Sequence, residues 1–121
     1  MPHLTLEYTN NLPGFPAASA LRELNDALSA SGYFEEADIK SRVCRLDTFL
    51  VGVSPNARGF VHVRLSILSG RSAETKRELS ASLLQVLKDR CAPTESVEVQ
   101  LSVEVQEMER GSYAKVAVPA R

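Results

Sequence analysis

Apolar and polar residues alternate in three separate segments of the chain. These segments are residues 3–8, 61–67 and 97–105, of which the last is the most regular. Alternation with a period of two places the apolar side chains on one face of an extended chain, which is typical of a half-buried β-strand. We therefore expect a strand in each segment.

Two longer segments carry apolar residues at helical spacing. One predicted helix covers about residues 16–31, with Gly32 as a natural stop, and the other follows Ser72, a favourable N-cap residue. The apolar stripes are Leu21, Leu24, Ala27 and Leu28 in the first helix and Leu79, Leu83, Val86 and Leu87 in the second. Each stripe predicts a helix face that packs on a core.

Residues 39–53 are rich in β-branched and apolar side chains, and they predict a long strand that bends near Asp47 and Thr48. Residues 54–59 then interrupt the pattern near the midpoint of the chain with turn-forming residues. Each half consequently has the order β-α-β. We expect one domain over residues 1–121, with pseudo-repeats at about 2–54 and 60–108.

This order of elements predicts an α+β fold. A helical crossover makes the two strands of each unit parallel, with a right-handed connection. Two such units side by side form a four-stranded sheet with both helices on one face. Because the other face is left uncovered, we expect a symmetric homo-oligomer that covers it.

The balance of charge limits the partners. The chain has 14 Lys and Arg against 15 Asp and Glu, a formal net charge of -1, which argues against nucleic acid or an anionic membrane as the main partner. The apolar stretches are only as long as strands, and the chain does not open with the charged and apolar regions of a signal peptide. We expect a cytoplasmic protein.

The sequence lacks the patterns of familiar cofactor sites. Cys44 and Cys91 have neither the close spacing nor the paired histidines of a metal site, so we expect reduced, partly buried thiols. The sequence also lacks a glycine-rich phosphate loop, a zinc motif and a serine nucleophile elbow. It therefore predicts chemistry without a metal or cofactor.

Pro2 is the first candidate for chemistry, because it directly follows Met1 at the head of a predicted strand. Removal of Met1 would leave a secondary amine, whereas every other proline nitrogen is locked in an amide without a proton. An α-amino group titrates near ~8 in model peptides, which suits a general base or acid at neutral pH. Proline after the initiator methionine can equally be without any role.

Three cations are candidates for binding an anionic substrate near such a base. Arg71 lies in a Gly-Arg-Ser turn before a helix, and Lys40 and Arg42 lie at the start of the long strand. A guanidinium offers a fork that binds a carboxylate, and nearby cations lower the pKa of an amine. Each could equally be a solvated surface charge. His3 and His62 lie in alternating strands, where we expect them to be structural residues with satisfied hydrogen bonds.

Three parts of the sequence carry a resemblance to a known family. They are residues 2–8, residues 39–43 followed by Asp47 and Thr48, and residues 60–62 leading to Gly70, Arg71 and Ser72. Together they resemble the 5-carboxymethyl-2-hydroxymuconate delta-isomerase family of the tautomerase superfamily. The likeness covers most of the chain, and the second half alone is also similar to a 4-oxalocrotonate tautomerase subunit.

The resemblance implies a cofactor-free isomerase of an unsaturated di- or tricarboxylate from homoprotocatechuate catabolism. Pro2 would take a proton from the 2-hydroxyl of a dienol and return it to carbon, and Arg71 would bind a substrate carboxylate. Lys40 and Arg42 stand where the family has further basic residues that bind substrate. Double-length chains of this superfamily form trimers, so the resemblance implies a homotrimer.

One residue departs from the family pattern, and one feature distinguishes the two repeats. The family pattern expects Arg-Ser-Arg-Val where this chain has Lys40 first, which keeps the charge but not the planar fork. Only the first unit begins with proline, since Val61 takes the equivalent place in the second, so we expect one site per chain. A promiscuous tautomerase of other enols, such as that of phenylpyruvate, and a non-catalytic trimeric binding module are the alternatives.

Overall fold

The computed structural model describes residues 1–93 and 96–121. Its elements are β1 (His3–Thr9), α1 (Ala17–Ala30), the short 3-10 helix η1 (Glu36–Asp38), β2 (Lys40–Leu46), β3 (Arg58–Leu68), α2 (Ala73–Arg90), β4 (Glu98–Met108) and the short 3-10 helix η2 (Arg110–Ser112). The order β-α-β therefore occurs twice along the chain. Ser72 caps α2 as expected, because its side chain accepts a hydrogen bond from the Thr75 amide.

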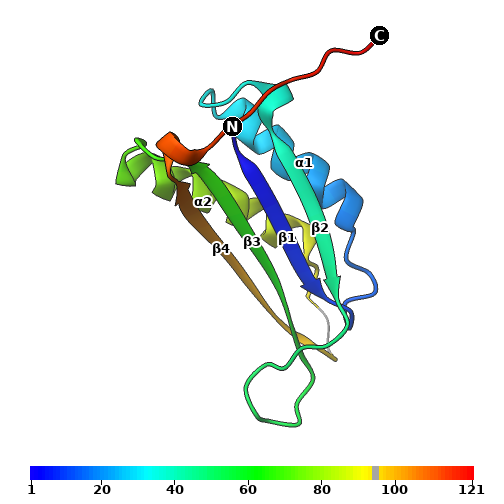
Figure 1. Cartoon of the computed structure of the whole chain (residues 1–121). Coiled ribbons are helices and arrows are strands. Elements are labelled where there is room, and N and C mark those ends of the chain that lie inside the picture. Colours follow the sequence, from blue (N-terminus) through cyan, green and yellow to red (C-terminus); the bar gives the residue numbers. More distant parts are fainter. Residues whose placement is uncertain (94–95) are drawn as a thin grey trace.

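The four strands form one mixed sheet in the order β2-β1-β3-β4. The two strands of each β-α-β unit are parallel, and β1 and β3 meet antiparallel in the centre. Both helices cover the same face of the sheet, and the opposite face is open (Figure 1). The predicted α+β fold is confirmed.

The hydrophobic core lies between this sheet and the two helices. Alternate residues of β1 and β3 point into it, and so do residues along one stripe of each helix. The core members with no exposed surface are Leu4, Leu6, Ala20, Leu24, Leu28, Val61, Val63, Leu65, Leu83 and Leu87. The hydrophobic pattern therefore identified the buried faces correctly, although Leu21, Ala27 and Val86 are only partly buried at the border of the core.

The predicted strand over residues 39–53 is wrong beyond Leu46. Residues 47–57 form an irregular loop instead, with Leu50 and Val53 exposed and Gly52 at a φ of 63°. The reason lies in the pairing. Since β2 is an edge strand, it hydrogen-bonds only to β1, whose last paired residue, Thr9, stands opposite Leu46.

β3 begins at Arg58, inside the segment that was predicted to be a turn. Gly59 can join this strand because it has no side chain. A Cβ there would lie 2.6 Å from Thr9 Oγ1 and 2.7 Å from Asn11 Oδ1, so only glycine lets the loop after β1 pack against the start of β3. This contact fixes one end of the central strand pair.

The cysteine and histidine predictions have different outcomes. Cys91 is partly buried, but Cys44 is exposed, because it lies opposite Glu7 on the open face of the edge strand. Both histidines have hydrogen-bond partners at each ring nitrogen, as expected. His3 contacts Tyr113 and Arg42, and the equivalent partners of His62 are Ser102 and Glu104.

Candidate functional site

The sheet register brings the chain start and the turn that carries Arg71 to the same end of the sheet. Because β1 and β3 are antiparallel, His3 stands opposite Ser66, and the chain before β1 meets the chain after β3. Arg71 follows the end of β3 by three residues. Figure 1 shows the N-terminus at the sheet end where β3 and β4 finish. Strand order thus places Pro2 near Arg71, although they are far apart in the sequence.

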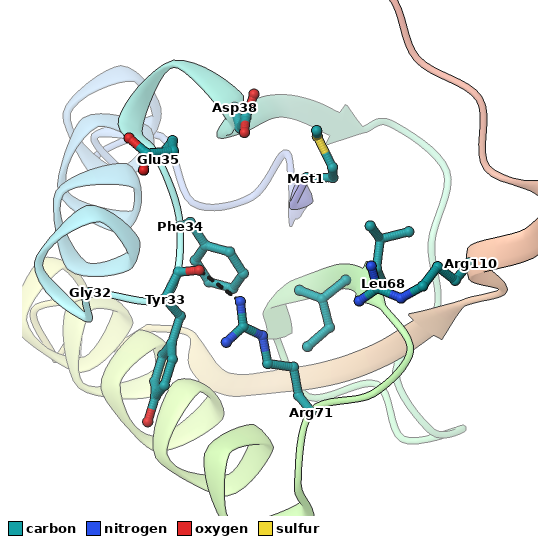
Figure 2. A pocket seen from close by; sticks show the side chains of 10 residues that line it. Met1, Gly32, Tyr33, Phe34, Glu35, Asp38, Leu68, Arg71 and Arg110 are labelled. Atoms are coloured by element: carbon teal, nitrogen blue, oxygen red, sulfur yellow. Dashed lines mark hydrogen bonds between the residues drawn. The ribbon is translucent and has the colours of Figure 1, made fainter.

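A pocket of about 260 Å³ opens at this end of the sheet. Its walls come from Met1, from residues 32–35 and Asp38 after α1, from the end of β3, and from Arg71 and Arg110. Figure 2 shows Met1, Arg71 and Arg110 entering this region from three different segments. The pocket therefore combines the chain start with two guanidinium groups.

Two aromatic residues and a carbonyl hold Arg71 in place. Its Nη2 donates a 2.7 Å hydrogen bond to the Tyr33 carbonyl oxygen. The guanidinium carbon also lies 5.1 Å from the centre of the Tyr33 ring and 5.3 Å from that of Phe34. Cation–π contacts of this kind orient a guanidinium without neutralising it. Arg71 therefore keeps its charge and most of its donors for an anion.

Pro2 itself is fully buried, and Met1 covers it on the pocket side. While Met1 is attached, the Pro2 nitrogen is an amide and the free amine belongs to Met1. The pKa of that amine is lowered, first by burial and then by the positive charges of Lys40, Lys115 and Arg71, against a raising effect of Asp38. Charges of both signs therefore act on this amine, and among them Asp38 has the largest effect.

Lys40 and Arg42 are close to the N-terminus but do not line the pocket. Lys40 is hydrogen-bonded to Pro2 through the backbone, and its ammonium donates a 2.7 Å hydrogen bond to the Asp38 carbonyl oxygen. Arg42 contacts His3 Nδ1 at 3.0 Å. Both side chains share the open face of the sheet with His3. The structure therefore brings Met1, which precedes Pro2, and Arg71 into one pocket and leaves Lys40 and Arg42 beside it.

The C-terminal segment closes one side of the site. Tyr113 contacts His3 Nε2 at 2.9 Å, and the Lys115 ammonium donates a hydrogen bond to the Asp38 carboxylate. The Lys115 contact holds the pKa of Asp38 below its ordinary value. The positive charge of Arg42 and burial lower the pKa of His3, with burial the larger cause. These contacts tie the end of the chain to its beginning.

Several residues of this pocket were not predicted from the sequence. The adjacent aromatic residues Tyr33 and Phe34, directly after Gly32, were a usable signal, because two aromatic side chains in a connection between a helix and a strand need a packing partner. Asp38 and Arg110 carried no distinctive signal. Their positions depend on which strand ends meet in the sheet, and no local sequence motif reveals that pairing.

A second pocket, of about 280 Å³, lies at the opposite end of the sheet, where residues 11–15 face Arg90, Cys91 and the start of β4. Burial raises the pKa of the Cys91 thiol, which makes it a weak nucleophile at neutral pH. Within residues 1–93 and 96–121, no group of three or more His, Cys, Asp or Glu is arranged to hold a metal ion. The pocket at Arg71 is therefore the stronger candidate.

Comparison with known proteins agrees with this geometry. The family model for 5-carboxymethyl-2-hydroxymuconate isomerase matches residues 2–121. The chain belongs to this family. It is 33% identical, over 115 residues, to the 5-carboxymethyl-2-hydroxymuconate Delta-isomerase of Escherichia coli, and the match covers 89% of this chain and 87% of that protein. Membership in the 5-carboxymethyl-2-hydroxymuconate isomerase family makes the chain an isomerase, so the suspected resemblance is confirmed.

Solved structures support the same fold. The crystal structure of a 5-carboxymethyl-2-hydroxymuconate isomerase from Deinococcus radiodurans R1 is 37% identical, with a TM-score of 0.88 over 95% of this chain and 88% of that one. A more distant match is a symmetric trimer of fused 4-OT, 21% identical with a TM-score of 0.66 over 93% of this chain and 90% of that chain. No helix in the described part of the chain is long and apolar enough to cross a membrane.

Proposed function

We propose that this isomerase converts the dienol 5-carboxymethyl-2-hydroxymuconate into its unsaturated keto isomer, with the Pro2 amine as acid and base after Met1 is removed. The single observation that carries this proposal is the shared pocket of Met1 and Arg71. Since Met1 is bonded directly to the Pro2 nitrogen, its removal leaves a secondary amine at the pocket wall. The choice of substrate follows the names of the similar isomerases from Escherichia coli and Deinococcus radiodurans R1.

The reaction needs no oxidant, reductant or cofactor, because the proton that leaves one atom returns to another. The Pro2 nitrogen accepts the proton of the 2-hydroxyl, and the electron pair of that O–H bond forms the ketone C=O. The double bonds shift along the conjugated chain, and the same nitrogen returns the proton to the terminal carbon of the diene. Arg71 binds a carboxylate of the substrate and stabilises the negative charge that spreads over the conjugated system.

The surroundings of the chain start suit an amine that acts as a base at neutral pH. An amine must be unprotonated to accept a proton, and the pKa of the Met1 amine is lowered by burial first and then by Lys40, Lys115 and Arg71, against a raising effect of Asp38. On this account the same cations act on the Pro2 amine, one residue along the chain. Lys40 is the nearest of them in the sheet, because its amide bonds to the Pro2 carbonyl oxygen. On this account Lys40 and Arg42 act on the substrate from the open sheet face, where they bind a carboxylate that extends out of the pocket.

We also propose that the chain is a homotrimer. The open face of the sheet carries polar side chains, and the apolar residues of β4 are only partly buried at the sheet edge. A second copy that packs on these surfaces would cover them. The fused 4-OT structure is a symmetric trimer of the same fold, which supports three copies.

The function is tested by ultraviolet kinetics with 5-carboxymethyl-2-hydroxymuconate, 2-hydroxymuconate and the enol of phenylpyruvate. The proposal expects the highest kcat/KM for the first substrate. A preference for the phenylpyruvate enol would favour a promiscuous tautomerase instead. Background rates with all three enols would contradict catalysis and favour a binding module.

A further inference from the structure

Arg110 lies on the wall of the pocket, and the mechanism above does not use it. It lies two residues beyond β4, in the short 3-10 helix η2. Because β3 and β4 are parallel and Leu68 stands opposite Met108, both strands finish at the same end of the sheet. Arg71 and Arg110 therefore reach the pocket from two neighbouring strand ends.

The side chain of Arg110 is held on one edge and free on the other. Its Nε and Nη2 donate hydrogen bonds of 3.2 and 3.0 Å to the Ser69 carbonyl oxygen. Nη1 makes no hydrogen bond to any described residue, and the side chain is exposed. A guanidinium anchored in this way has little conformational entropy left to lose when it binds an anion.

The charges near Arg110 leave its own charge uncompensated. The two carboxylates on the pocket wall belong to Asp38 and Glu35. Asp38 is paired with Lys115, and Glu35 is exposed, with no salt bridge to a described cation. Arg110 likewise forms no salt bridge within the part of the chain described. Its charge is therefore available to a ligand.

We infer that Arg110 binds a second carboxylate of the substrate, at a position separate from the carboxylate bound by Arg71. This inference rests on the proposed function and assigns to Arg110 one of the carboxylates of its substrate. Two fixed guanidinium groups on neighbouring walls select a molecule with an acid group at each end, whereas a monocarboxylate uses only one of them. Arg110 is thus a specificity-determining residue.

A positioning role is the main competing explanation, because Arg110 also holds the loop that carries Arg71. Through Ser69 it could fix residues 69–71 and affect every substrate alike. The two roles differ in their dependence on the number of carboxylates. Loss of a loop contact should weaken the binding of monocarboxylates and dicarboxylates equally. Loss of the residue that binds the second carboxylate should weaken the binding only of molecules that carry a second acid group.

A matched pair of unreactive probes separates these roles. trans,trans-Muconate and sorbate share the same six-carbon diene and differ by one carboxylate. Calorimetric titration of the Met1-processed enzyme is expected to show muconate bound at least about 10-fold more tightly than sorbate, the size expected for a charge-assisted hydrogen bond. Arg110→Gln should remove most of that difference and leave sorbate binding within about 2-fold. Arg45→Gln, which removes the same charge from an exposed residue of β2, should change neither affinity.

Kinetics with the same variants then separate this inference from the proposed function. Arg110→Gln should lower kcat/KM about 10-fold or more for 2-hydroxymuconate and little for the phenylpyruvate enol. Equal losses for both substrates and both probes would overturn the inference in favour of a positioning role, and no loss would overturn it outright. A wild-type enzyme without turnover would contradict the proposed function, while the muconate and sorbate affinities would still decide the role of Arg110.

Discussion

The Tyr33 carbonyl oxygen accepts a 2.7 Å hydrogen bond from Nη2 of Arg71. The contact joins the connection after α1 to the turn before α2, so the two β-α-β units share one site. The Tyr33 and Phe34 rings flank the same guanidinium. The geometry of this arginine therefore depends on both halves of the chain, and each half alone lacks part of the pocket.

Replacement of Arg71 is predicted to reduce activity without loss of fold. Arg71→Ala removes a charge-assisted carboxylate contact, so kcat/KM should fall by about 10-fold or more. Arg71→Lys should retain only part of the wild-type kcat/KM, because an ammonium offers neither the planar fork nor stacking on the two rings. Steady-state kinetics measure the effect, and size-exclusion chromatography is the control. A variant that dissociates or unfolds would show instead that Arg71 is structural.

The pH dependence of kcat/KM should follow the charges around the N-terminal amine. The base works when unprotonated, so the acidic limb rises as the pH passes upward through its pKa. Burial lowers the pKa of the Met1 amine most, Asp38 raises it, and Lys40, Lys115 and Arg71 lower it. We expect these charges to act with the same signs on the Pro2 amine of the processed chain. Asp38→Asn should therefore shift the limb to lower pH, and Lys40→Met should shift it to higher pH.

The control for this pH profile is Lys88→Met, which removes a positive charge from the last turn of α2. It should leave the acidic limb unchanged. Shifts of the same sign in Asp38→Asn and Lys40→Met would contradict the electrostatic account, because these residues carry opposite charges.

Acid should release the C-terminal segment. The pKa of Asp38 is lowered in the folded state by its hydrogen bond to Lys115. The contribution of this pair is therefore complete above the ordinary pKa of 3.8 and is lost as the pH falls through the lowered value. The heteronuclear NOE of the amides at residues 113–118 should fall as the pH drops through the lowered pKa of Asp38, and Lys115→Met should show low values already at neutral pH. Equal values in wild type and Lys115→Met at neutral pH would contradict this anchor.

Gly59→Ala should destabilise the fold. Its Cβ would lie 2.6 Å from Thr9 Oγ1, so either the strand or the loop after β1 must move, at a cost of about 1–3 kcal/mol. Chemical denaturation measures this loss. Gly14→Ala is the matched control, because a Cβ there meets no atom within 4 Å, and it should keep or slightly raise the free energy of unfolding.

Periodicity in the sequence was enough to predict the two-layer fold. The alternation in β1 and β3 and the stripes of both helices identify buried faces, because side-chain direction follows directly from strand and helix geometry. The end of β2 was missed because a strand stops where its neighbour stops, and Val51 and Val53 keep β-favouring chemistry after β1 has ended. Cys44 was misplaced for a related reason, since exposure of a residue on an edge strand depends on the layer that covers it.

The candidate site was only partly predictable. Pro2 and Arg71 could be named from their chemistry, but their proximity follows from the antiparallel register of β1 and β3. Arg110 could not be named, because its place depends on Leu68 standing opposite Met108. Long-range register of this kind comes from packing of the whole sheet, and no local motif encodes it.

The most direct test of the central claim compares three forms of the protein in the ultraviolet assay with 5-carboxymethyl-2-hydroxymuconate. They are the Met1-processed chain, a chain with one retained residue before Pro2, and Pro2→Ala, each verified by intact mass. The account predicts rapid isomerisation by the processed chain. It also predicts a fall of about 100-fold or more in the extended chain, whose Pro2 nitrogen is an amide, and a large fall in Pro2→Ala. Equal rates in the processed and extended chains would contradict proline-based catalysis.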